Sequence, residues 1–193
     1  MKTRVISCCL IIMSISFSID FLNAAPVESR LDVLKGIEIT SGKLYQVPKI
    51  KQKHGTVVLF LSSVCPCTNG AIEKISELIK KYKSKGFEMV VVNLDHKGKL
   101  SSLESYYKKT GIQAPIIWDD QLKIAKSFNV KMMAEAVILS KSDEIIYQGG
   151  IRTEDDQYPL ISALDEIISE KKISVPKGKG MGCLLLYPNT KSP

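Results

Sequence analysis

A cysteine pair separated by one proline, Cys65-Pro66-Cys67, is the group of residues in this sequence best suited to chemistry. It follows the apolar run at residues 56–61 and precedes an amphipathic stretch, so it lies where a buried strand gives way to a helix. The thiolate is the reactive form of cysteine, and unpaired N–H groups at the start of a helix stabilise an anion. Pro66 suits a first helical turn because its φ is already helical. The position predicts that Cys65 is a nucleophilic thiol.

The spacing of this pair differs from that of a Cys-x-x-Cys redox motif. A disulfide between Cys65 and Cys67 would close a small, strained ring, and strained disulfides are easily reduced. A third cysteine, Cys183, lies in the apolar segment 181–186, after the flexible stretch 177–180. We therefore predict that Cys183 is the partner of the Cys65 site. Two alternatives remain open, namely that Cys65 and Cys67 are structural core residues and that Cys183 belongs to a loose, inert tail.

The composition is that of an ordinary globular protein. The chain has 193 residues, of which 45% are hydrophobic and 24% are charged, and this length suits one domain with an extension. The formal net charge is +7, but lysines alternate with glutamates along the predicted helices and no aromatic residues interleave with them. We therefore expect a solvated basic surface and no nucleic-acid partner.

The first 25 residues have the pattern of a secretory signal peptide. Lys2 and Arg4 precede fifteen uncharged residues at 5–19, and the small residues Ala24 and Ala25 would suit a signal peptidase. The uncharged run is short for a membrane span, which needs about 20 residues. We therefore expect export to a periplasmic or extracellular location and no stable membrane span after cleavage. The alternative is that the segment is retained as a membrane anchor.

Removal of this segment would change the cysteine count. The full chain has five cysteines, and cleavage would leave Cys65, Cys67 and Cys183 in a compartment where disulfides persist. Because three is an odd number, at least one thiol would be free or transiently paired.

Apolar periodicity predicts strands that alternate with helices from residue 56 onwards, which calls for a largely parallel sheet covered on both faces. A possible hairpin comes earlier, within residues 37–46. The expected strands are 56–61, 87–93, 115–118, 136–139 and 144–148, the last two forming a hairpin, and the helices are 70–85, about 101–110, one capped by Asp119 or Asp120, and one beginning at Pro159. Ser101 and Glu104 have the spacing of a capping box.

Four segments resemble the redoxin domain of the thioredoxin-like superfamily, the group that includes alkyl hydroperoxide reductase and thiol-specific antioxidant proteins. They are VVLFLSSVCP at 57–66, MVVVNLD at 89–95, IAKSFNV at 124–130 and AVILSKSDEIIYQGGI at 136–151. The resemblance covers roughly residues 50 to 185 and includes the Gly-Cys tail. It implies an α/β thioredoxin-like fold: a central mixed sheet with helices on both faces and a redoxin-type insertion. The resulting division is a signal peptide at 1–25, an N-terminal extension at 26–55, the redoxin domain at 56–172 and a tail at 173–193.

The sequence departs from the family pattern near the thiols. Thr68 stands where the thioredoxin motif has its second cysteine, and Val58 and Ser62 replace a proline and a threonine of the peroxiredoxin pattern. Ala134 stands where the family has a cis-proline. Because a cis bond before alanine is costly, we expect a trans bond, a differently shaped loop and weaker substrate docking. A proline at this position should raise the exchange rate if the backbone can still adopt the cis form.

The resemblance and the cysteines together predict an exported thiol–disulfide oxidoreductase that needs no cofactor and no metal. Cys65 would be the nucleophile, and Cys67 or Cys183 the resolving thiol. The partners would be protein thiols or disulfides and an unidentified electron donor. One alternative is a thiol peroxidase, in which Cys65 reduces a hydroperoxide through a sulfenic acid.

The second alternative is a non-enzymatic protein that binds a soft ion such as Cu(I) on the same fold. The cysteines could hold the ion together with Met132 or Met133. Neither His54 nor His96 lies at ligand spacing from them, and no histidine follows His96, unlike in copper-delivery relatives of the fold. Asp95, Glu135 and Arg152 fall in family-like segments, but the sequence assigns them no chemical role.

Overall fold

The structure is a computed structural model that describes residues 29–49 and 52–188. The predicted signal peptide lies outside the described residues, and so do Cys8 and Cys9. Among the residues described, no helix is both long and apolar enough to cross a membrane.

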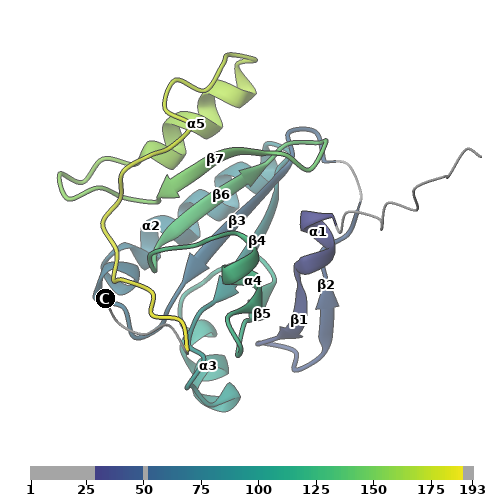
Figure 1. Ribbon diagram of the computed structural model, residues 1–193, viewed down its shortest axis with the longest axis vertical. Coiled ribbons are helices and arrows are strands. Elements are labelled where there is room, and N and C mark those ends of the chain that lie inside the picture. Colours follow the sequence, from purple (N-terminus) through teal and green to yellow (C-terminus); the bar gives the residue numbers. More distant parts are fainter. Residues whose placement is uncertain (1–28, 50–51, 189–193) are drawn as a thin grey trace, which may run out of the picture.

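Within this part of the chain, the strands form one mixed sheet of seven strands in the order β2-β1-β5-β4-β3-β6-β7 (Figure 1). Their bounds are β1 Lys35–Glu38, β2 Leu44–Gln46, β3 Thr56–Leu61, β4 Glu88–Asn93, β5 Ile116–Trp118, β6 Glu135–Leu139 and β7 Ile145–Gly150. The three central strands β3, β4 and β5 are parallel, and the pairs on either side of them are antiparallel. The predicted hairpin near the C-terminal end is present as β6 and β7.

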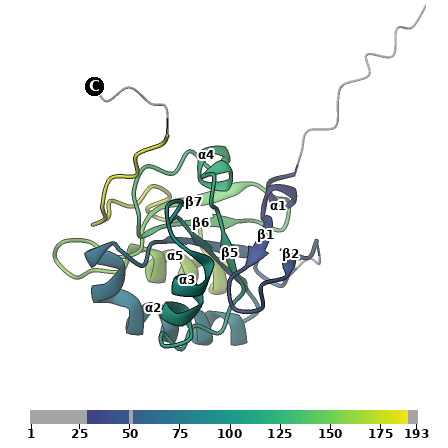
Figure 2. The same cartoon turned by 90° about the horizontal axis from the view of Figure 1, so that it is seen from below.

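Helices cover both faces of this sheet, as the sequence predicts for a thioredoxin-like fold. Their bounds are α1 Arg30–Val33, α2 Pro66–Ser84, α3 Leu100–Tyr107, α4 Lys123–Ser127 and α5 Pro159–Ile168. Figure 2 shows α1 and α4 on one side of the sheet and α2, α3 and α5 on the other. The two sides bury separate hydrophobic clusters.

Strand β3 contributes to both clusters because every residue in it is buried. Leu59 and Leu61 pack in the cluster under α2 and α5, whereas Val58 and Phe60 pack in the cluster under α4. A strand with two buried faces needs a continuous apolar run, which explains why the sequence predicts it well. The strand ends at Leu61, and the chain then reaches the cysteine pair.

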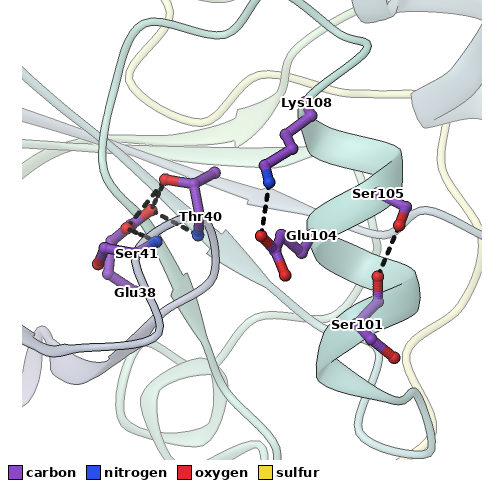
Figure 3. Close-up of polar contacts among 7 residues, drawn as sticks. All are labelled: Glu38, Thr40, Ser41, Ser101, Glu104, Ser105 and Lys108. Carbon is purple, nitrogen blue, oxygen red and sulfur yellow. Dashed lines mark hydrogen bonds and ion pairs between the residues drawn. The ribbon is translucent and has the colours of Figure 1, made fainter.

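The predicted N-terminal hairpin is present as β1 and β2, and it forms one edge of the main sheet. Ile37 of β1 pairs with Leu44 of β2 on one side and with Trp118 of β5 on the other. The turn is held by the carboxylate of Glu38, which accepts hydrogen bonds from the hydroxyl and N–H of Thr40 and from the N–H of Ser41 (Figure 3). Burial alone would raise the pKa of Glu38, but these hydrogen bonds outweigh it and the pKa is lowered.

Helix α2 begins at Pro66, earlier than the predicted residue 70. Cys65 is its N-cap residue, and Pro66 occupies the first helical position. The apolar stripe that reveals the helix in the sequence starts only at Ala71. The first turn is therefore invisible to periodicity, although it contains Cys67.

The predicted capping box at Ser101 and Glu104 is wrong. Helix α3 already begins at Leu100, and its N-cap residue, Lys99, makes no side-chain cap hydrogen bond. Inside the helix, the Ser101 carbonyl accepts a hydrogen bond from the Ser105 hydroxyl, and Glu104 pairs with Lys108 at 2.6 Å (Figure 3). Leu100 packs against the core on the same helical face as the buried Leu103 and Tyr107. This packing explains why the helix begins at Leu100 and not after Ser101.

Asp119 stabilises the start of α4 without being its N-cap residue, which is Leu122. Its buried carboxylate accepts hydrogen bonds from the N–H groups of Ile124 at 3.1 Å and Ala125 at 2.8 Å. Of the two predicted capping residues, Asp119 therefore makes the contact. Helix α5 begins at Pro159, as predicted.

Candidate active site

Cys65 lies between the end of β3 and the first turn of α2, and the residue is only 1% exposed. Its backbone is extended, with φ −83° and ψ 119°, and turns the chain from the strand into the helix. Two hydrogen bonds stabilise the preceding loop. The N–H of Ser62 donates to the Thr68 hydroxyl at 3.4 Å, and the N–H of Cys65 donates to the Ser62 carbonyl at 3.4 Å. Cys65 therefore lies at the junction of strand and helix that the sequence predicts.

The structure brings the three predicted site cysteines together. The Sγ atoms of Cys65, Cys67 and Cys183 all lie within 4.8 Å of one another. The shortest separation, 2.7 Å, is between Cys65 and Cys183, and all three are free thiols. A disulfide has an S–S bond of about 2.05 Å, so a small movement would bring Cys65 and Cys183 to bonding distance.

The C-terminal segment holds Cys183 in place by pairing with the loop before β6. The N–H of Met133 donates to the Cys183 carbonyl at 2.9 Å, and the N–H of Leu185 donates to the Lys131 carbonyl at 2.9 Å. Between them, Leu184 forms an antiparallel bridge with Met132. Figure 1 shows this yellow segment running down past the lower-left end of α2. The alternative of a loose tail around Cys183 is therefore wrong.

Hydrogen bonds to the sulfur make Cys65 the most acidic of the three thiols. Burial by itself would raise the pKa of Cys65, but hydrogen bonds from the Cys183 thiol and from the N–H groups of Thr68, Cys183 and Cys67 outweigh it, so the pKa is lowered. The hydrogen bond from the Cys183 thiol is the largest of these lowering contributions, so this thiol is an important donor to the Cys65 thiolate.

The other two thiols are shifted in the opposite direction. The hydrogen bond to Cys65 and, after it, burial and the negative charge of Cys65 raise the pKa of Cys183 to about 11. Burial and the charge of Cys65 also raise the pKa of Cys67, although the positive charge of Arg152 opposes this effect. The cluster thus favours one thiolate, on Cys65, beside two protonated thiols.

Asp95 fixes the loop that carries Cys65, a role that the sequence does not reveal. Its carboxylate, 8% exposed, accepts hydrogen bonds from the hydroxyl of Ser62 and from the N–H and hydroxyl of Ser63, at 2.8 and 2.6 Å. The Asn93 amide donates to the same carboxylate at 3.0 Å. Since β3 and β4 are parallel, the residues that follow them meet at one edge of the sheet. This placement is the feature of the sequence from which a contact between Asp95 and the cysteine loop could be predicted.

Ala134 has a trans peptide bond and a left-handed backbone, with φ 66°; no cis bond occurs in the described residues. The predicted trans bond is therefore confirmed. The N–H of Ala134 donates to the Phe60 carbonyl at 2.8 Å, and its carbonyl accepts from the N–H of Ile151 at 3.1 Å. These bonds anchor the residue that follows Met133, to which the Cys183 segment is attached.

Glu135 and Arg152 also position this region. The Glu135 carboxylate accepts hydrogen bonds from the N–H groups of Lys131 at 2.9 Å and Met132 at 3.2 Å, which shapes the loop that the C-terminal segment contacts. The Arg152 carbonyl accepts from the N–H of Met181 at 2.7 Å. The contact between Arg152 and Met181 joins residues far apart in the sequence, so local patterns could not show it. Glu135 is close in sequence to Lys131 and Met132, and its contacts depend on the shape of the loop.

The two histidines are not part of the sulfur cluster. His54 packs against the ring of Phe87, with the centroids 5.3 Å apart. His96 lines a cavity of about 380 Å³ beside the cysteine loop, whose walls include Val64 and Met133. In the described part of the chain, the group of side chains that could hold a metal ion consists of the three cysteines.

The geometry agrees with a comparison against protein families. The sequence model of the Redoxin family matches residues 32–157. The chain belongs to the Redoxin family. The matched region contains Cys65 and Cys67 but ends before Cys183. The match therefore does not include the part of the expected resemblance between residues 158 and 185. Membership supports a thioredoxin-like redox function. No curated protein matches the chain significantly.

Solved structures show that the fold is shared. A conserved protein of uncharacterised function from Geobacillus kaustophilus has a TM-score of 0.71 and 17% identity, covering 82% of this chain and 90% of its own. A hypothetical protein from Sinorhizobium meliloti 1021 has a TM-score of 0.71 and 16% identity, covering 85% and 97%. A secreted Mycobacterium tuberculosis disulfide oxidoreductase has a TM-score of 0.50 and 16% identity, covering 60% and 81%. The chain is also similar to a thioredoxin-like protein in its oxidised form, with a TM-score of 0.57 and 14% identity, so the shared fold is thioredoxin-like.

Proposed function

We propose that this redoxin is a thiol–disulfide oxidoreductase in which Cys65 is the nucleophile and Cys183 the resolving thiol. The observation that carries the proposal is the contact of 2.7 Å between the sulfurs of Cys65 and Cys183, at the start of α2. One sulfur has a lowered pKa and the other a raised one, so the pair has the polarity that a nucleophile and a waiting second thiol require.

The first step is attack by the Cys65 thiolate on one sulfur of a partner disulfide. A mixed disulfide forms between Cys65 and that sulfur, and the other sulfur of the partner leaves as a thiolate. The charge on Cys65 disappears in this step. Because hydrogen bonding to Cys65 and its charge raise the pKa of Cys183, their loss allows Cys183 to give up its proton to solvent or to the departing thiolate.

The second step is attack by the Cys183 thiolate on the Cys65 sulfur. A Cys65–Cys183 disulfide forms, the second partner sulfur leaves, and two electrons have passed from the cysteine pair to the partner. An external dithiol then reduces the Cys65–Cys183 bond. Cys67 is a poorer resolving thiol, since its disulfide with Cys65 would close a small, strained ring.

The test is a reduction assay on a model protein disulfide such as insulin, with a dithiol as electron donor. Cys65→Ser should abolish turnover, and Cys183→Ser should accumulate a mixed disulfide at Cys65 that mass spectrometry detects. Cys67→Ser should retain most of the turnover. Full turnover by Cys65→Ser would overturn the proposal. Hydrogen peroxide offered in place of insulin tests the peroxidase alternative, which predicts peroxide consumption and a sulfenic acid on Cys65.

A soft-metal site is a second candidate, favoured by the three sulfurs within 4.8 Å of one another. Thiolates select soft ions such as Cu(I), and binding would release the protons of Cys67 and Cys183. Competition with a Cu(I) chelator under reducing conditions tests it. Stoichiometric binding that is lost in Cys183→Ser would support it, and copper bound equally well by this variant would not.

We also propose that the protein is exported and that residues 1–25 are removed as a signal peptide. The supporting pattern is the charged start, the short uncharged run and the small residues before Pro26. The intact mass of the exported protein tests this proposal, and a mass that still includes Met1 would contradict it.

A further inference from the structure

The C-terminal segment 176–187 brings the sulfur of Cys183 against the buried Cys65. It first follows the edge strand β7 and the residues after it, and it then crosses to the loop before β6. Its backbone pairs along the whole path. The hydrogen bonds are Gln148 N–H to Pro176 O at 3.0 Å, Gly150 N–H to Gly178 O at 3.2 Å, Met181 N–H to Arg152 O at 2.7 Å, Met133 N–H to Cys183 O at 2.9 Å and Leu185 N–H to Lys131 O at 2.9 Å.

Three glycines allow this close approach. Gly178, Gly180 and Gly182 recur at every second position, which places them on one side of an extended segment. An added Cβ at Gly182 would collide with the Met133 carbonyl oxygen, and one at Gly180 would collide with the backbone of Gly150. The segment therefore docks through backbone contacts that any larger residue would prevent.

The attachment of the segment is nevertheless limited. Between residues 176 and 183 it is held by single backbone hydrogen bonds, and its first buried apolar side chain is Leu185. Single hydrogen bonds near the surface contribute little to the free energy of unfolding, so such a segment can open locally while the domain remains folded.

A partner disulfide cannot reach the Cys65 sulfur while the segment is docked, because Cys65 is 1% exposed and the Cys183 sulfur lies against it. We propose that residues 176–187 form a displaceable cover over Cys65. The cover occupies the place that the reacting segment of a partner protein would take, so each turnover requires the cover to leave and to return. This proposal rests on the proposed thiol–disulfide exchange.

The geometry also defines the kind of partner that fits. Release of the cover frees the N–H of Met133 and the carbonyl of Lys131, two groups that pair with an extended backbone. The partner segment would therefore be extended, with its cysteine where Cys183 now lies. Since a Cβ at Gly182 meets the Met133 oxygen, a partner with glycine before its cysteine fits best.

The test uses Gly182→Ala in the full chain, which disturbs the docking without altering a cysteine. Gly70→Ala is the matched control, because a Cβ at Gly70 meets nothing within 4 Å and this residue lies in α2 near the same site. Two rates are measured: the limiting rate of Cys65 alkylation by iodoacetamide at alkaline pH, and the rate of Cys65–Cys183 disulfide formation with an added oxidant. Peptide mapping assigns each product.

If the segment is a cover, iodoacetamide should alkylate Cys65 about fivefold faster in Gly182→Ala, and the internal disulfide should form about fivefold more slowly, which is the change expected from losing one backbone hydrogen bond. Gly70→Ala should match the native protein in both rates. Gly180→Ala, at a second contact, should repeat the result and guards against a folding defect of the first variant. An unchanged alkylation rate in folded Gly182→Ala and Gly180→Ala would overturn the cover. Since alkylation needs no partner disulfide, this outcome is distinct from a failure of the insulin assay.

Discussion

The sulfur of Cys183 lies 2.7 Å from the sulfur of Cys65, although 118 positions separate the two residues in the sequence. The contact depends on two independent parts of the fold. Helix α2 fixes Cys65 at its N-cap, and the loop before β6 fixes Cys183 through the N–H of Met133. A disulfide here would close a long loop, and the chain-entropy model assigns such a bond about 4–5 kcal/mol of stabilisation. Oxidation is therefore expected to stabilise the fold as well as to resolve Cys65.

The order in which the thiols react follows from their pKa values. Alkylation at graded pH should label Cys65 at lower pH than Cys183, because the pKa of Cys65 is lowered and that of Cys183 is raised to about 11. Cys183→Ala removes a hydrogen bond to the Cys65 sulfur and should move the titration of Cys65 to higher pH. Ultraviolet absorbance of the thiolate measures the shift, with Cys67→Ala as the comparison. A lower pH midpoint of alkylation for Cys183 than for Cys65 would contradict the assignment of the nucleophile.

Asp95 should matter for both stability and exchange. Asp95→Ala leaves the donors of Ser62, Ser63 and Asn93 without their acceptor, and the free energy of unfolding should fall by about 1–3 kcal/mol. The loop carrying Cys65 should loosen and insulin reduction should slow. Urea denaturation and the insulin assay measure the two effects. Asp120→Asn, an exposed neighbour of the buried Asp119, is the control, and equal behaviour of the two variants would argue against this role.

The sequence predicts those parts of the fold that depend on apolar patterns. Strand β3 is buried on both faces and has a continuous apolar sequence. The β6–β7 hairpin is marked by a short polar segment between two apolar strands. The approach of Cys183 to the site could also be predicted, because a poor internal partner for Cys65 and an apolar segment around Cys183 both favour it. These signals lie within short stretches of chain.

Buried polar contacts could not be predicted in the same way. The hydrogen bonds of Asp95 with Ser62 and of Glu135 with Lys131 depend on the register of strands and on loop shape, which no local pattern encodes. Periodicity places the start of α2 too late because the first turn has no apolar stripe, and the capping box predicted at Ser101 is wrong because Leu100 packs in the core. Tertiary packing overrode a plausible local pattern in that case.

Substitution of Ala134 by proline is expected to be harmful, in contrast to the gain in exchange rate predicted from the family pattern. Proline has no N–H to donate to the Phe60 carbonyl, and its fixed negative φ does not match the φ of 66° at this position. The free energy of unfolding of Ala134→Pro should fall by about 2–3 kcal/mol. Ala134→Gly is the matched control, since glycine accepts a positive φ, and should be as stable as the native protein or slightly more so. Faster insulin reduction by Ala134→Pro would show that the loop can adopt the family's shape.

The adjacent leucines of the C-terminal segment provide a matched pair for testing how that segment is anchored. Leu185 is 5% exposed and packs in the cluster under α4, whereas Leu184 is 68% exposed. Leu185→Ala removes a buried side chain and should weaken the docking, since such truncations cost about 2–5 kcal/mol in a closed core and less where the site can relax. We expect the Cys65–Cys183 disulfide to form at least about tenfold more slowly in Leu185→Ala, because 1.4 kcal/mol of docking energy corresponds to a factor of ten. Leu184→Ala should form it at the native rate. The rates are followed by quenching with an alkylating reagent and mapping the disulfide peptide. Equal rates in the two variants would mean that the backbone hydrogen bonds alone position Cys183, and the burial of Leu185 would then have no part in the resolving step.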